Sequence, residues 1–368
     1  MPSPRRSSRR DFLTGTAARD ALEGFADGIK AEVPAATVSP HEGSPAPTYL
    51  LELARDAMAV EFQVLLNAGE HNQAPQSAVA ALDLLEPLEA QLTVYRETSE
   101  VSRLNLSARS REVVVEPRLF QLLQLGQRIA HDTGGAYDLT SGPLSKLWGF
   151  YRRQGRLPTE AEIADTLEHV GYQRLALDEA NCTARFHADS MEINLGGIGK
   201  GYALDRMAEL LRADAVENFL LHGGQSSVLA YGSRAGASSE QPGWTVGLAH
   251  PLRPEVRLAE FRLHNQALGT SGSGTQFFHF QGQRYGHILD PRTGRPAAGV
   301  LSSTVIAPTA AEADALSTAF YVGGIALAES YCAAHMSVGA VLVTTASAAG
   351  ELLLSALNLD DSQFTRCE

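Results

Sequence analysis

Helical and strand-like apolar patterns do not alternate regularly in this chain, and this irregular order is the feature that most limits its fold. Apolar residues recur at helical spacing over residues 79–88 and 119–129. Residues 301–307 and 338–344 are strongly β-like, and a helix is predicted between them over 311–331. Regular βαβ alternation would predict a parallel sheet, and strands alone would predict a sandwich or barrel. We therefore expect an α+β fold with mainly antiparallel or mixed sheets, packed helices, and two closely associated lobes forming one unit.

The remaining elements follow from shorter patterns. They are strands over 57–66, 191–195, 219–221 and 228–230, a helix over 158–170, and a helix from the end of a glycine loop through Leu210. Residues 1–48 are rich in Pro, Ser, Gly and charge, so we expect a flexible arm there and one functional domain over 49–368.

Charge and apolar content exclude several classes of protein. The formal net charge of -12 disfavours binding to nucleic acid. No segment approaches the roughly 20 apolar residues of a membrane span. Cys182, Cys332 and Cys367 are too scattered for a disulfide framework or a metal–thiolate site.

The N-terminus permits two interpretations. Residues 8–13 resemble the start of a twin-arginine export signal through Arg9 and Arg10, but no apolar segment follows. We favour a coincidental or degenerate signal and a cytoplasmic protein, with export by the twin-arginine route as the alternative.

A glycine loop over 194–202 is the first candidate binding site. It contains Asn194, Gly197 and Lys200, and it leads into a predicted helix. Glycines let a backbone approach a ligand closely, and a helix N-terminus favours anions. The loop is not a Walker A motif, because Asn194 stands where that motif needs its first glycine and Gly201 follows the lysine. Lysine is rare in this chain, with three in total, so Lys200 does not reflect background usage. Taken alone, the loop fits a tight turn with a solvated lysine better, and phosphate or flavin contact is favoured once the other motifs are considered.

Asp314 and Thr318 form the second candidate. They are four residues apart on a predicted helix and therefore share one face. A carboxylate and a hydroxyl suit Mg²⁺, which keeps water and phosphate oxygens as its other ligands. Taken alone, the pair also fits a helix-start aspartate and an unrelated core threonine.

His287 and Ile288 precede a strong turn signal over 290–294. A neutral imidazole at a strand end can accept a proton from a hydroxyl nucleophile. The alternative is a histidine that only contacts its own turn.

Three further segments are less specific. Residues 135–144 contain Ala136, Tyr137 and Asp138 ahead of an aromatic cluster, which suits a ring ligand or a packed loop. Tyr95 can stack on a purine or fill the interior. Residues 270–274 form a small-residue loop that can admit a phosphate or act as an ordinary turn.

Taken in the order in which they occur along the chain, these segments resemble the FAD:protein FMN transferases of the ApbE type, from about Met58 to Tyr331. The resemblance implies Mg²⁺ and FAD, with FAD as the substrate, and an acceptor protein that carries a Ser/Thr motif. It also implies individual roles for residues of this chain: Mg²⁺ ligands at Gly197, Asp314 and Thr318; FAD contacts at Met58, Tyr95, Ala136, Tyr137, Asp138, Asn194, Lys200 and Ile288; and His287 as the residue that activates the acceptor hydroxyl.

The sequence also departs from the family pattern. Met58-Ala59-Val60 replaces Met-Gly-Thr, Asn194 replaces an aspartate, and Gly199 stands where alanine is common. These changes affect the expected FAD pocket and leave the expected metal and base positions intact.

The implied reaction is Mg²⁺-dependent transfer of the FMN half of FAD to a Ser or Thr hydroxyl, with release of AMP. Two alternatives stay open at this point. Water in place of the acceptor would make the protein an FAD pyrophosphatase, and loss of chemistry would leave an FAD-binding protein.

Overall fold

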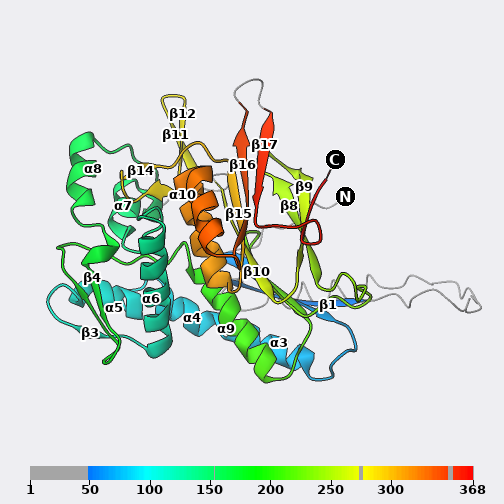
Figure 1. Cartoon of the computed structure of the whole chain (residues 1–368). Coiled ribbons are helices and arrows are strands. Elements are labelled where there is room, and N and C mark those ends of the chain that lie inside the picture. The colour runs from blue at the N-terminus through cyan, green and yellow to red at the C-terminus, as the bar shows by residue number, and fades with distance from the viewer. Residues whose placement is uncertain (1–48, 153, 273–276, 347–350, 368) are drawn as a thin grey trace, which may run out of the picture. The chain divides into compact units, whose positions relative to one another are not determined.

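The computed structural model describes residues 49–152, 154–272, 277–346 and 351–367 (Figure 1). The predicted N-terminal arm over 1–48, with its twin-arginine-like segment, lies outside these residues. Their centre is an eight-stranded sheet in which every neighbouring pair is antiparallel. In spatial order its strands are β1 (Leu50–Ala57), β2 (Val60–Asn67), β6 (Phe219–Gly223), β7 (Ser227–Tyr231), β10 (Gln266–Gly272), β15 (Ser302–Ala307), β16 (Gly339–Thr345) and β17 (Leu352–Leu357).

The central strands of this sheet are buried on both faces, which explains the mostly apolar sequences of β6, β7 and β16. β15 is equally buried although it begins with Ser302, Ser303 and Thr304. Successive side chains point to opposite faces. On β6, Leu220 packs into one hydrophobic cluster, and Phe219 and Leu221 pack into another. On β15, Ile306 packs into the same cluster as Leu220, and Val305 packs into the same cluster as Phe219 and Leu221. The sheet is therefore the middle layer of three.

A second, three-stranded sheet covers one face. It is formed by β8 (Trp244–His250), β9 (Arg253–Leu263) and β18 (Phe364–Arg366). Trp244, Val246 and Leu248 alternate with exposed residues along β8 and pack against the large sheet. These strands were not predicted from the sequence.

Helices cover the other face (Figure 1). The ones that contact the large sheet most extensively are α3 (Ala74–Asp83), α9 (Gly199–Ala213) and α10 (Ala310–Ala334). α10 is kinked at Gly324, whose φ of 73° lies outside helical space. In the part of the chain that the structure describes, no helix is long and apolar enough to span a bilayer.

The other elements surround this face. They are α4 (Leu85–Leu92), α5 (Glu100–Ser107), α6 (Pro117–Asp132), α7 (Gly142–Leu147), η1 (Phe150–Arg152), α8 (Glu160–Leu167), η2 (Tyr172–Arg174), a small sheet of β3 (Val113–Val114), β5 (Thr183–Phe186) and β4 (Leu175–Asp178), and the hairpins β11 (Phe277–Phe280) with β12 (Gln283–Gly286) and β13 (Leu289–Asp290) with β14 (Arg295–Pro296). The α+β class with mainly antiparallel sheets is confirmed.

Two predicted strands were wrong in detail. The segment 57–66 contains a turn, because Met58 and Ala59 have positive φ values of 49° and 63° and join β1 to β2. Residues 191–195 make an isolated bridge at Glu192 and no strand ladder. Asn105 explains the second case, because its side-chain amide donates to the Ile193 carbonyl at 2.9 Å and accepts from the Ile193 N–H at 2.8 Å.

One helical position also differs from the prediction. Val79 was expected on the apolar stripe of the helix over 79–88, but it is 45% exposed. That segment is divided between α3 and α4. Leu82, Leu85 and Leu88 are buried as predicted, and Ala78 and Ala81 are buried in place of Val79.

Candidate active site

Asp314 lies in the first half of α10 and is 6% exposed. Its Oδ1 accepts a hydrogen bond from the Ser227 hydroxyl at 2.7 Å, and its Oδ2 accepts one from the Gly201 N–H at 2.8 Å. The Lys200 ammonium lies 3.9 Å from Oδ2. The carboxylate thus joins the start of α9, strand β7 and helix α10.

The start of α10 is held against α9 by close backbone contact. Asp205 on α9 accepts hydrogen bonds from the N–H groups of Ala310 and Ala311 at 2.8 and 2.9 Å. One turn earlier on α9, a Cβ on Gly201 would lie 2.0 Å from the Ala310 carbonyl oxygen, so only glycine fits there. These contacts fix the position of Asp314 relative to the glycine loop.

Thr318 lies one helical turn after Asp314. Its hydroxyl is 3.2 Å from the Asp314 carbonyl oxygen and 3.0 Å from the Ser271 hydroxyl. A Cβ placed on Gly197 would lie 3.5 Å from this hydroxyl and 3.2 Å from Cε2 of Tyr137. The structure therefore brings together Gly197, Thr318 and Asp314.

The glycine loop takes its shape from Asn194. The Asn194 side-chain oxygen accepts a hydrogen bond from the Gly196 N–H at 2.8 Å. The backbone N–H of Asn194 donates to the Leu139 carbonyl at 2.8 Å. An aspartate here could accept the same bond, so the substitution of Asn for Asp preserves the loop while removing one negative charge.

Burial governs the protonation of this region. It raises the pKa of Asp314, while Lys200, Ser227 and the Gly201 N–H act in the opposite direction. It also raises the pKa of Asp205 to about 7. Burial, followed by the charges of Asp138 and Asp314, raises the pKa of Tyr137 far above its ordinary value. The Tyr137 hydroxyl is therefore neutral at any physiological pH.

The Asp138 carboxylate is engaged within the protein. Its Oδ1 accepts from the Thr140 N–H at 2.8 Å and the Thr140 hydroxyl at 2.7 Å, and its Oδ2 accepts from the Tyr172 N–H at 2.7 Å. Asp138 thus orders the loop that also carries Ala136 and Tyr137, both of which are buried.

His287 follows directly after β12 and is half-buried. Its ring meets the Phe150 ring edge-on at 6.4 Å between centroids. The Trp148 indole lies 5.8 Å from the Tyr285 ring and donates to the Gly294 carbonyl at 2.7 Å. The aromatic segment after α7 therefore packs against the turn that carries His287.

Two further residues that the resemblance assigns to FAD are Ile288 and Met58. Ile288 is 9% exposed, belongs to the main core, and accepts a backbone hydrogen bond from Ala297 at 2.9 Å. Met58 donates its N–H to Glu89 Oε2 at 2.8 Å across the β1–β2 turn.

Tyr95 is 66% exposed and pairs with a second tyrosine that the sequence did not single out. The Tyr95 and Tyr151 ring centroids are 4.7 Å apart. Lys146 lies 5.3 Å from the Tyr151 ring and forms a 2.5 Å ion pair with Glu192, two residues before Asn194. Through these successive contacts, Tyr95 is connected to the glycine loop.

The chemistry of the donor set restricts what the site can bind. In the described residues, no group of three His, Cys, Asp or Glu side chains is placed to hold a metal ion. One buried carboxylate, one hydroxyl and a backbone carbonyl suit a hard cation that takes its remaining ligands from water or phosphate. The Gly197, Asp314 and Thr318 set fits Mg²⁺ better than a cation that needs an all-protein cage.

Two contributors to this site were missed by sequence reasoning. They are Ser227, which contacts Asp314, and Asp205, which accepts from the first N–H groups of α10. Ser271 was part of the segment predicted as a small-residue loop over 270–274; its hydroxyl contacts Thr318, but residues 270–272 belong to strand β10 and Ser273 and Gly274 lie outside the described residues. No local pattern distinguishes these hydroxyls from ordinary strand residues.

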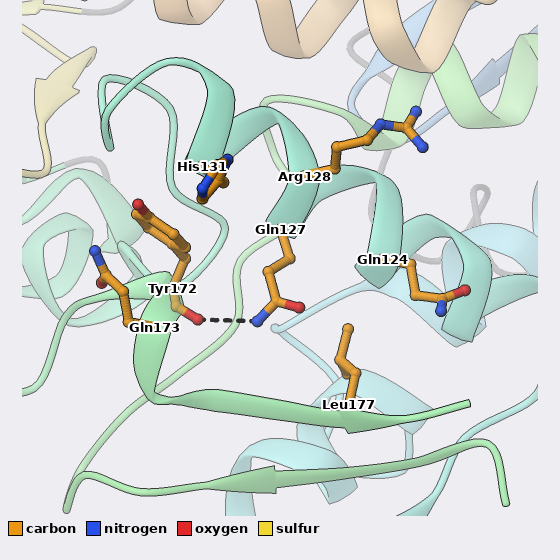
Figure 2. A pocket seen from close by; sticks show the side chains of 7 residues that line it. All are labelled: Gln124, Gln127, Arg128, His131, Tyr172, Gln173 and Leu177. Atoms are coloured by element: carbon orange, nitrogen blue, oxygen red, sulfur yellow. Dashed lines mark hydrogen bonds between the residues drawn. The ribbon is translucent and has the colours of Figure 1, made fainter. Parts of the chain in front are cut away.

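A separate open hollow of about 560 Å³ lies between α6 and the η2–β4 segment (Figure 2). Gln127 at its wall donates to the Tyr172 and Leu175 carbonyls at 3.0 and 2.6 Å. The hollow shares no lining residue with the Asp314 site. We therefore place the candidate chemistry at Asp314.

Comparison with known proteins identifies similar chains. The family model described as "ApbE family" matches residues 58–342. An FAD:protein FMN transferase of Klebsiella pneumoniae is 32% identical over 294 residues, which cover 78% of this chain and 88% of that protein. One of Haemophilus influenzae is 30% identical over 250 residues, covering 66% and 70%.

Solved structures agree in fold. The ApbE protein of Thermotoga maritima superposes with a TM-score of 0.73 at 30% identity, covering 83% of this chain and 97% of that one. The flavin transferase ApbE of Vibrio cholerae gives 0.73 at 25% identity, covering 84% and 98%.

Proposed function

This chain belongs to the ApbE family, and on that premise we propose that it is an FAD:protein FMN transferase. It moves the FMN half of FAD to a Ser or Thr hydroxyl of an acceptor protein and releases AMP. The observation that carries this proposal is the convergence of Lys200, Asp314, Thr318 and Gly197. The function belongs to the domain over residues 49–368.

The residues of the site would hold a divalent cation and the phosphates together. Asp314, Thr318 and the Gly197 carbonyl would hold Mg²⁺, which when bound neutralises charge on the pyrophosphate. Lys200 supplies a further positive charge from the start of α9, where backbone N–H groups also favour anions. The structural support is that Asp314 is buried, so a cation compensates a charge that is otherwise costly.

The flavin and adenine ends would be bound on either side of this centre. Tyr95, with Tyr151 beneath it, offers an exposed aromatic face for the adenine. The remaining proposed FAD contacts are Met58, Ala136, Tyr137, Asp138, Asn194 and Ile288. Through its hydrogen bonds to Thr140 and Tyr172, Asp138 also orders the loop around Ala136 and Tyr137.

His287 would act as the general base. It accepts the proton of the acceptor hydroxyl while the acceptor oxygen bonds to the FMN phosphorus. The bond from that phosphorus to the AMP oxygen breaks, and AMP leaves. Phe150 packs edge-on against the imidazole and restricts its orientation.

The deciding experiment is incubation with FAD, Mg²⁺ and a flavin-acceptor domain, read by intact mass. We expect a covalent FMN adduct on the acceptor and release of AMP. Free FMN with AMP and no adduct would make the protein a pyrophosphatase, and bound FAD without turnover would make it a binding protein.

The metal requirement has its own test. Asp314→Ala should abolish transfer and Mn²⁺ binding, because it removes the charged ligand. Glu329→Gln, an exposed carboxylate on the same helix, is the matched control and should retain both. Transfer at the wild-type rate in Asp314→Ala, or with divalent cations chelated, would exclude the proposed metal role.

A further inference from the structure

The Tyr137 hydroxyl is a buried polar group without a partner. The residue is 4% exposed, and its hydroxyl has no hydrogen-bond partner among the described residues. Leaving a buried donor unpaired costs about 1–3 kcal/mol. Buried polar groups in native proteins are almost always paired, so this exception calls for a ligand or a bound water.

The hydroxyl lies at the candidate cation site. Cε2, the ring carbon next to the hydroxyl-bearing carbon, is 3.2 Å from the position of a Cβ on Gly197, and the Thr318 hydroxyl is 3.5 Å from the same point. Gly197 and the Thr318 hydroxyl therefore lie beside the hydroxyl-bearing side of this ring.

Asp314 does not satisfy Tyr137. Both of its carboxylate oxygens already accept hydrogen bonds, from Ser227 and from the Gly201 N–H. A tyrosine hydroxyl can donate one hydrogen bond, and an oxygen that carries negative charge or is polarised by a cation is a suitable acceptor.

Building on the proposed function, we propose that the Tyr137 hydroxyl donates a hydrogen bond to an oxygen coordinated to the cation at Asp314 and Thr318. That oxygen belongs to water before FAD binds and to the pyrophosphate afterwards. Tyr137 is then a positioning residue, which orients one ligand of the cation and acts through it.

The test is Tyr137→Phe, which removes the hydroxyl and keeps the ring. Mn²⁺ affinity is measured without FAD by calorimetry or by electron paramagnetic resonance, and FAD affinity is measured without metal. A lost hydrogen bond of about 1–2 kcal/mol corresponds to roughly 5- to 30-fold weaker Mn²⁺ binding. FAD affinity without metal should stay within about twofold, because no cation then holds a pyrophosphate oxygen beside the hydroxyl.

Stability gives a second readout that a purely structural role would not produce. Without metal, Tyr137→Phe should be at least as stable as the wild type, because the substitution removes an unpaired donor. The increase in Tm caused by Mn²⁺ should shrink in the variant. Tyr331→Phe is the control, a tyrosine that is 5% exposed and whose charged neighbours are Glu312, Asp132 and Arg128.

Three outcomes would overturn the inference. They are Mn²⁺ affinity within twofold of the wild type, an equal loss of metal-free FAD binding, or a destabilised metal-free variant. Failure of the proposed function looks different: the wild type would give no FMN adduct, while its Mn²⁺ binding would still depend on Tyr137.

Discussion

The Lys200 ammonium lies 3.9 Å from the Asp314 carboxylate, so the glycine loop provides the counterion of a carboxylate on a helix that is distant in the sequence. Lys200 keeps 24% of its side chain exposed, whereas the Asp314 side chain is 6% exposed. A partly solvated cation beside a buried carboxylate can move to a phosphate when a metal ion takes its place. We therefore predict that Lys200 and a metal ion bound at Asp314 compete for this carboxylate.

This competition predicts opposite effects of Lys200→Gln on the two ligands. Without FAD, Mn²⁺ should bind as tightly as in the wild type or severalfold more tightly, because a neighbouring positive charge is gone. FAD should bind at least about tenfold more weakly, because a charge-assisted contact to phosphate is lost. Titration calorimetry measures both affinities.

Lys200→Arg is the control for this experiment, since it keeps the charge, and it should retain most of the FAD affinity. A Lys200→Gln variant that loses Mn²⁺ binding would contradict the competition and make Lys200 a structural support of Asp314.

Two glycines on α9 should respond differently to alanine. In Gly201→Ala the new Cβ would lie 2.0 Å from the Ala310 carbonyl oxygen, so α10 must shift. We expect the free energy of unfolding to fall by about 2 kcal/mol or more, which is typical of overpacking against a rigid neighbour. In Gly199→Ala the nearest atom would be 3.9 Å away, and stability should be unchanged or slightly higher.

Urea unfolding of the two variants measures this difference, and Mn²⁺ binding shows whether Asp314 has moved. Equal stabilities would mean that the α9–α10 contact adapts to the additional carbon.

The pKa of Asp205 predicts a pH dependence of stability. Burial raises it to about 7 from an ordinary value of 3.8, so between these values the folded state holds a proton that the unfolded state has released. The contribution of Asp205 to the free energy of unfolding therefore falls as pH rises towards 7, by up to about 1.4 kcal/mol per pH unit. Above pH 7 it should level off.

In Asp205→Asn the side chain at position 205 does not titrate, so comparison with the wild type isolates the pH-dependent contribution of Asp205. The difference in unfolding free energy between wild type and variant should shrink from pH 5.5 to pH 7, as measured by urea denaturation. A constant difference would show that the N–H groups of Ala310 and Ala311 stabilise the ionised carboxylate despite its burial.

His287→Asn should slow transfer and leave FAD binding intact. Removing a general base lowers a rate by about 10²–10⁴-fold. Intact-mass time courses give the rate, and flavin fluorescence gives the FAD affinity. His279→Asn, an exposed histidine on β11, should behave as the wild type. Loss of FAD affinity in His287→Asn would make His287 a structural residue.

Much of the fold could be predicted because its signals are local. The helix predicted over 119–129 is found as α6, and the helix over 311–331 as α10. The strand over 191–195 was wrong because the distant amide of Asn105 occupies the backbone groups of Ile193. Sequence spacing contains no information about such a partner.

By itself, the sequence determined the helical turn that separates Asp314 from Thr318 and the glycine loop that ends at Lys200. Both depend on backbone geometry between neighbouring residues. Only the tertiary structure decided that Ser227 and Ser271 hold these side chains and that, within the described part of the chain, the Tyr137 hydroxyl has no hydrogen-bond partner. Those contacts join residues far apart in the chain, and packing of the sheet against α9 and α10 creates them.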